Sequence, residues 1–101
     1  MKRILILPSF ERSVKKLTRH DKDNLAESLE DLNSFLLLGW NFQGKFLAPA
    51  GFGFKKINHD KYEFRVDIRL RVVVKVEGED YYLVLAGNHD EVKRYLRHNR
   101  V

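Results

Sequence analysis

The stretch YEFRVDIRLRVVVKVEGEDYYLVLAGN, residues 62–88, decides the fold class because its apolar residues recur at every second position. Apolar and charged residues alternate through residues 62–68, and a second alternating set runs through 70–76. A period of two is typical of β-strands with one buried face. Residues 78–80 predict a turn, and residues 81–86 are apolar on both faces, which predicts a central strand covered on both sides.

A short helix is predicted ahead of this stretch. Phe10, Val14 and Leu17 follow a 4,3 spacing that forms one apolar stripe. Ser9 precedes the stripe at the position of an N-cap, where its hydroxyl would accept a hydrogen bond from a free backbone N–H group.

A second helix is predicted directly after the first. Thr18 and Asp21 resemble a capping box, with Asp in the place of the usual Glu or Gln. The apolar stripe that follows consists of Leu25, Leu29, Leu32 and Leu36. Gly39 comes after the last turn as a stop signal, so the two helices form an αα-hairpin.

The remaining elements lie near the two ends of the chain and after the helices. Residues 4–7 are apolar, residues 55–58 form the weakest strand, and Asn88 with Glu91 predicts the capped start of a closing helix. The predicted order is therefore β-α-α-β-β-β-β-α, an α+β arrangement.

Composition bounds the class of protein. At 101 residues we expect a single domain over 1–101, and the absence of cysteine excludes disulfides, thiolate zinc sites and cysteine nucleophiles. No segment approaches the roughly 20 apolar residues of a membrane helix, so we expect a cytoplasmic protein. The formal charge of +5 divides into +5 over residues 1–20, −4 over 21–38 and +4 over 39–101. Such segregation suits a polyanionic ligand, although a basic balance also serves solubility.

The alternation predicts where charged side chains gather. If Phe64 and Val72 face the helices, the opposite face of the hairpin carries Glu63, Arg65, Asp67, Arg69, Arg71 and Lys75. Guanidinium groups offer planar, bidentate donors to phosphate, which makes this face a candidate phosphate-binding surface. The alternative is a solvated sheet face with Arg–carboxylate pairs.

Two residues near the closing helix are candidates for proton chemistry. His89 follows the last strand, where an imidazole could exchange a proton near neutral pH, and Tyr95 comes six residues later. The alternatives are a turn histidine and a core aromatic. The aromatic-rich segment 39–53 could stack bases, bind a partner or cover the sheet edge. His20, His59 and His98 lack zinc-ligand spacing, and we expect no metal or cofactor.

These motifs together resemble the RelE/ParE toxins of type II toxin–antitoxin systems. The resemblance rests on a helical segment, two strands that each carry an arginine, and a strand-glycine-helix junction; the matching stretches are 10–17, 54–57, 62–66, 71–74, 85–89 and Tyr95. It implies a small twisted antiparallel sheet with an N-terminal helical hairpin on one face and a C-terminal helix. Residues 39–53 are longer than this pattern expects.

The RelE branch of this resemblance implies a metal-free endoribonuclease that cuts mRNA in the ribosomal A site through 2′-hydroxyl attack. By motif, Arg65 and Arg71 would bind the scissile phosphate, His89 would exchange protons, and Tyr95 would orient the base or the nucleophile. Lys55, Lys56, Arg69 and Lys75 are the further RNA-binding candidates. Glu63 departs from the pattern because some family enzymes carry a lysine near that position.

The resemblance also implies a cognate antitoxin as a partner, together with mRNA in the ribosome, and no membrane. The alternative function is a ParE-like DNA gyrase inhibitor without nuclease activity. His89 and Tyr95 favour the nuclease, since ParE-type proteins lack a proton-transfer set. A third possibility is an inactive relative that only binds an antitoxin.

Overall fold

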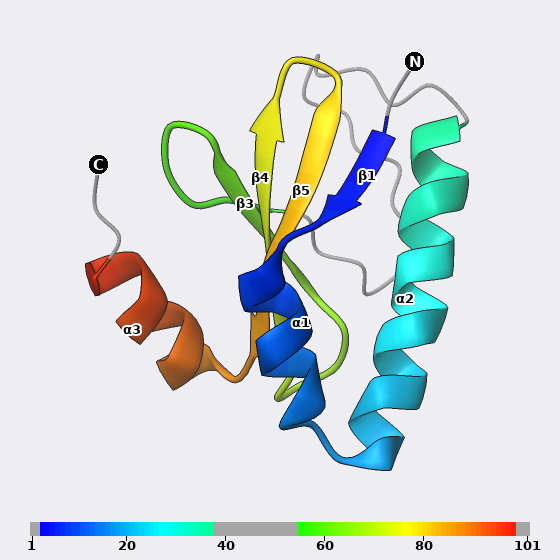
Figure 1. Ribbon diagram of the computed structural model, residues 1–101, viewed down its shortest axis with the longest axis vertical. Coiled ribbons are helices and arrows are strands. Elements are labelled where there is room, and N and C mark those ends of the chain that lie inside the picture. The colour runs from blue at the N-terminus through cyan, green and yellow to red at the C-terminus, as the bar shows by residue number, and fades with distance from the viewer. Residues whose placement is uncertain (1–2, 38–54, 99–101) are drawn as a thin grey trace.

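The computed structural model describes residues 3–37 and 55–98, which form a five-stranded sheet with three helices (Figure 1). The strands are β1 (Arg3–Ile6), β2 (Lys55–Lys56), β3 (Lys61–Arg65), β4 (Arg71–Glu77) and β5 (Asp80–Gly87). The helices are α1 (Pro8–Lys15), α2 (Arg19–Leu37) and α3 (His89–His98). The order of elements and the α+β class are those that the sequence predicts. Gly39 and the aromatic segment 39–53 lie outside the described residues.

The strands lie in the order β1-β5-β4-β3-β2. Neighbours from β2 to β5 are antiparallel, but β1 pairs with β5 in parallel, so the sheet is mixed rather than wholly antiparallel. β5 is an inner strand, as its apolar faces predict, and β4 occupies the middle. A register shift between Val73 and Val74 interrupts the β4–β5 ladder.

The two faces of the sheet carry separate apolar clusters. On one face, buried residues of α1 and α2 such as Phe10 and Leu25 pack against Phe64, Val72 and Leu83. The second cluster joins the buried residues Val73, Val84 and Val92, the last from α3. Since successive strand residues point to opposite faces, the helical hairpin and α3 cover opposite faces of the sheet.

Local hydrogen bonds define two of the helix starts as predicted. Thr18 Oγ1 accepts the Asp21 N–H at 3.1 Å. At α3, Asn88 Oδ1 accepts the Glu91 N–H at 2.8 Å while Glu91 Oε1 accepts the Asn88 N–H at 3.0 Å, a reciprocal capping box.

The predicted N-cap role of Ser9 is wrong. α1 begins at Pro8 with Leu7 as its N-cap, because proline fits the first helical position, where no N–H partner is needed. Ser9 is therefore inside the helix, and its hydroxyl donates a 2.6 Å hydrogen bond to the Val84 carbonyl of β5. The side chain fastens α1 to the sheet instead of capping the helix.

Candidate functional site

The central feature of the candidate site is a pair of arginines on adjacent strands. Arg65, the last residue of β3, is the register partner of Arg71, the first residue of β4, and Arg71 is in turn the register partner of Gly87 at the end of β5. Register partners project from the same face of a sheet, with their Cβ atoms about 5 Å apart. The structure thus brings the two predicted phosphate-binding residues together.

The arginine pair lies on the α3 face of the sheet. Phe64 and Val72, their neighbours in sequence, point into the cluster under α1 and α2. Arg65 is exposed, whereas the Arg71 side chain is only 19% exposed. The predicted face therefore exists, and α3 shares it.

Glu63 restrains one member of the pair. Its Oε1 accepts a hydrogen bond from Arg71 Nη1 at 3.1 Å, and the Glu63 side chain is 15% exposed. No ion pair joins Arg65 to any residue in the described ranges. The two arginines thus differ: Arg71 is held in place by a carboxylate, whereas Arg65 is exposed and forms no ion pair within the described residues.

The predicted lysines divide between the two faces. Lys55 is the register partner of Glu63 and shares the arginine face, whereas Lys56 pairs with Tyr62 and projects from the other face. Lys75 pairs with Lys61 on the arginine face, and its Nζ lies 3.6 Å from Glu77 Oε2. Lys75 is four residues from Arg71 along β4, a separation of about 13 Å.

Asp67 and Arg69 do not extend this face, contrary to the prediction. They belong to the turn between β3 and β4, where Asp67 Oδ1 accepts the N–H groups of Arg69 at 2.8 Å and Leu70 at 2.9 Å. The hydrogen bond from Arg69 N–H, with those from Leu70 and Asn24, lowers the pKa of Asp67. The turn's own hydrogen bonds redirect both residues, a requirement that strand alternation does not capture.

His89 and Tyr95 stand on different sides of α3. His89 is exposed, begins the helix and follows Gly87 by two residues, which places it at the same end of the sheet as the arginine pair. Tyr95 is half-buried against the cluster of Val73, Val84 and Val92. Six helical residues correspond to a rotation of about 120° between the two side chains. The structure therefore places His89 at the same end of the sheet as the arginines and Tyr95 within the packing under α3.

Gly87 permits α3 to approach the strand end. A Cβ at this position would lie 3.1 Å from both Cβ and Oε1 of Glu91, tighter than ordinary contacts. The missing side chain leaves room for Glu91 to fold back and complete its cap with Asn88, which fixes the helix start that carries His89.

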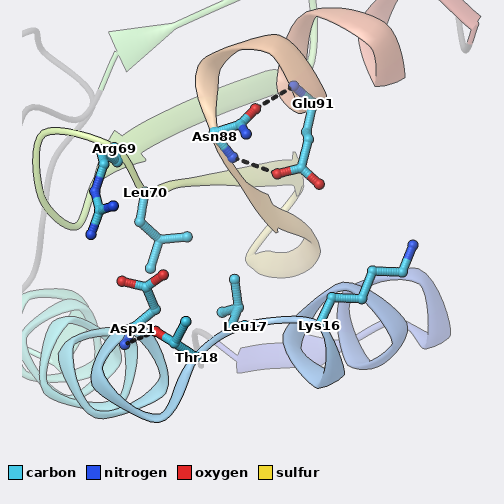
Figure 2. A pocket seen from close by; sticks show the side chains of 8 residues that line it. All are labelled: Lys16, Leu17, Thr18, Asp21, Arg69, Leu70, Asn88 and Glu91. Carbon is cyan, nitrogen blue, oxygen red and sulfur yellow. Dashed lines mark hydrogen bonds between the residues drawn. The ribbon is translucent and has the colours of Figure 1, made fainter.

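Two cavities could not be predicted from the sequence, because each is lined by segments that lie far apart in the chain. One, of about 230 Å³, lies where the α1–α2 connection, the β3–β4 turn and the start of α3 meet (Figure 2). Its lining comprises Lys16, Leu17, Thr18, Asp21, Arg69, Leu70, Asn88 and Glu91. Arg69 thus lines this mixed-charge cavity (Figure 2).

The second cavity, of about 400 Å³, lies between α3 and the segment that connects β2 to β3. It is lined by Ile57, Asn58, Lys93, Leu96 and Arg97. The described residues contain no group of three or more histidine and carboxylate side chains arranged to hold a metal ion. Within the same residues, no helix is long and apolar enough to span a membrane.

Comparison with known proteins establishes the class of fold. No protein-family model and no curated protein matches the sequence. Among solved structures, YafQ from Escherichia coli BL21(DE3) matches with a TM-score of 0.65 and 15% identity, over 91% of this chain and 98% of that chain. YafQ in the E. coli DinJ–YafQ complex gives a TM-score of 0.66 and 16% identity, over the same shares of 91% and 98%.

A third match extends the comparison beyond E. coli. The antitoxin–toxin complex of RelB and RelE from Methanococcus jannaschii matches with a TM-score of 0.62 and 18% identity, over 90% of this chain and 96% of that chain. The fold is therefore that of the RelE-like toxins, as the sequence motifs suggest. The chain is similar to the YafQ and RelE structures along nearly its whole length.

Proposed function

We propose that this protein is the toxin of a toxin–antitoxin pair and that it cleaves mRNA on the ribosome without a metal ion. The observation that carries the proposal is the direct juxtaposition of Arg65 and Arg71 on one sheet face, at the strand end where His89 begins α3. Two like charges opposite each other oppose folding, and a bound phosphate would relieve that repulsion. The RelE-like fold supports the same reading.

The proposed chemistry needs charge stabilisation and two proton transfers. The 2′-hydroxyl oxygen forms a bond to the adjacent phosphorus as the bond to the 5′-oxygen of the next nucleotide breaks, which leaves a 2′,3′-cyclic phosphate. Arg65 and Arg71 stabilise the charge on the phosphate, an effect whose removal typically costs about 10²–10³ in rate. His89 takes the 2′-proton or protonates the leaving oxygen, a role typically worth about 10²–10⁴.

The remaining candidates act around this centre in the proposal. Lys55 lies on the same face and adds positive charge toward the RNA backbone. Tyr95 packs against the cluster that contains Val73, the residue between Arg71 and Lys75 on that face, and serves as a positioning residue. Arg71 keeps its orientation through its ion pair with Glu63. Glu63, which stands near the position where some RelE-like enzymes carry a lysine, therefore holds a phosphate-binding arginine in place.

The proposed partners are a cognate antitoxin and the mRNA of a translating ribosome in the cytoplasm. Two of the three matching structures reported above are named as complexes, of DinJ with YafQ and of RelB with RelE. An antitoxin that covers the basic face would suppress cleavage. None of the three matching structures reported above is named as a gyrase inhibitor, and no observation favours that alternative.

The test is primer-extension mapping of transcripts after induction, with analysis of the new RNA ends. We expect cuts in phase with codons and 2′,3′-cyclic phosphate ends, lost in Arg71→Gln and His89→Ala and retained in Arg12→Gln. Arg12 is an exposed cation on α1 and serves as the matched control. Intact transcripts with the wild-type protein, or full cleavage by both folded site variants, would refute the proposal.

A further inference from the structure

A cavity of about 400 Å³ lies on the arginine face between α3 and the segment that connects β2 to β3, and we name it the α3 groove. The α3 groove is lined by Ile57, Asn58, Lys93, Leu96 and Arg97. In Figure 1, α3 runs outward on the same side of the view as the loop between β2 and β3. The cavity therefore lies beside the C-terminal part of α3, away from the helix start that carries His89.

The side of α3 that faces the groove carries a row of basic side chains. His89, Lys93 and Arg97 are spaced by four residues, so they form one ridge with neighbours about 6 Å apart along the helix axis. Lys93 and Arg97 are exposed, and no ion pair joins either to a residue in the described ranges. The ridge begins at the candidate proton-transfer residue and ends at the cavity.

The cavity combines this charge with an apolar floor and an amide. Ile57 and Leu96 are partly buried and pack against the cluster of Val73, Val84 and Val92. Asn58 is exposed at the rim, where its side-chain amide can both donate and accept hydrogen bonds. Proteins bind single-stranded RNA through cations that contact its backbone, surfaces that pack against a base ring and polar groups that hydrogen-bond the edge of the base. The cavity offers all three kinds of group.

We propose that the α3 groove binds the single-stranded RNA next to the scissile phosphate. Lys93 and Arg97 contact successive phosphates, and one nucleobase occupies the cavity against Ile57 and Leu96 with its edge at Asn58. This inference rests on the proposed function for the identity of the ligand as RNA. It adds a substrate subsite on α3 that lies outside the arginine and histidine centre.

The experiment measures RNA affinity as a function of salt. The probe is a fluorescent 12-nucleotide RNA with 2′-O-methyl groups, which block the attack and keep the probe intact. Each lost phosphate contact lowers the slope of log affinity against log salt by about 0.7 for a single strand. We therefore expect Lys93→Gln with Arg97→Gln to lower the slope by about 1.4, whereas the control Arg12→Gln with Lys15→Gln on α1 leaves it unchanged.

A second variant separates the base from the backbone. Asn58→Ala removes the proposed contact to the base edge, so we expect a changed preference among U-, A- and C-rich probes with the salt slope unchanged. Because Asn58, Lys93 and Arg97 are exposed, these substitutions leave the apolar clusters intact, and thermal melts verify the fold.

Three results would overturn the inference. One is a wild-type slope in the α3 double variant, and another is an equal loss in the α1 control. The third is a finding that binding of a poly-glutamate peptide depends on Lys93 and Arg97 while RNA binding does not. The groove would then be a polypeptide site. Cleavage that depends on Arg71 with an unchanged slope refutes this inference alone. A lowered slope without any cleavage in cells refutes the nuclease and leaves the groove standing.

Discussion

Replacing Arg65 with glutamine should stabilise the fold while it removes activity. Arg65 stands directly opposite Arg71, is exposed, and has no carboxylate partner among the described residues. Directly opposed like charges on a sheet cost about 0.2–1 kcal/mol, and glutamine keeps most of the side chain without its charge. For a domain of this size, a gain of 1 kcal/mol raises Tm by about 4–8 °C, so we expect an increase of about 1–8 °C.

Replacing Arg71 in the same way should have the opposite sign. Its loss leaves the Glu63 carboxylate, only 15% exposed, without its 3.1 Å partner. An unsatisfied group at such a position costs about 1–3 kcal/mol. Thermal melts of both variants and of the double variant form a cycle, and high salt should shrink the Arg65 gain because exposed charges are screened. If Arg65→Gln destabilises the protein as much as Arg71→Gln does, Arg65 holds the structure together and the reasoning fails.

Three further predictions concern the scaffold. Asp67→Ala should destabilise the protein by about 1–2 kcal/mol in urea titration, since two turn N–H groups lose their acceptor. The pKa of Asp67 is lowered in the fold, so its contribution is present above about pH 4 and disappears as pH falls through the folded pKa; Asp67→Asn should flatten this acid limb, and an unchanged limb would contradict the assignment. Burial raises the pKa of Tyr81 to about 12, so between about pH 10 and 12 the unfolded state ionises first and stability falls; Tyr81→Phe should remove that part of the alkaline loss, measured by urea titration at each pH. Gly87→Ala should lower Tm because the added methyl meets Glu91, and Glu91→Ala in the same chain should recover part of the loss; additive losses would show that the contact is unimportant.

Local patterns predicted much of the fold because they act over a few residues. The alternation in residues 62–76 located β3 and β4, and the capping boxes at Thr18 and Asn88 located two helix starts. The N-cap prediction for Ser9 failed because a competing local signal, the proline at position 8, occupies the first helical position. Pairing between distant segments was the other gap, since nothing local to residues 3–6 specifies a parallel partner in β5.

The candidate site was predictable where strand register alone determines it. Alternation was enough to place Arg65 and Arg71 on one face. Their sequence neighbours Phe64 and Val72 point to the helical-hairpin face, so both arginines project from the opposite face. Alternation failed for Arg69, because the hydrogen-bonded turn between β3 and β4 places that residue at the first cavity. Tyr95 could not be oriented from sequence, since its side of α3 depends on how that helix packs on Val73 and Val84.

The parallel pairing of β1 with β5 also governs when the molecule can be completed. Arg3 donates to both carboxylate oxygens of Asp80, at 2.9 and 3.0 Å, across 77 residues of chain. During synthesis, the first strand made must therefore wait for the last one before it has a neighbour, and such long-range pairing is slow to form. Because β1 is the first strand to leave the ribosome and β5 is the last of the five described strands, the sheet reaches its full width only after residue 87 has been synthesised.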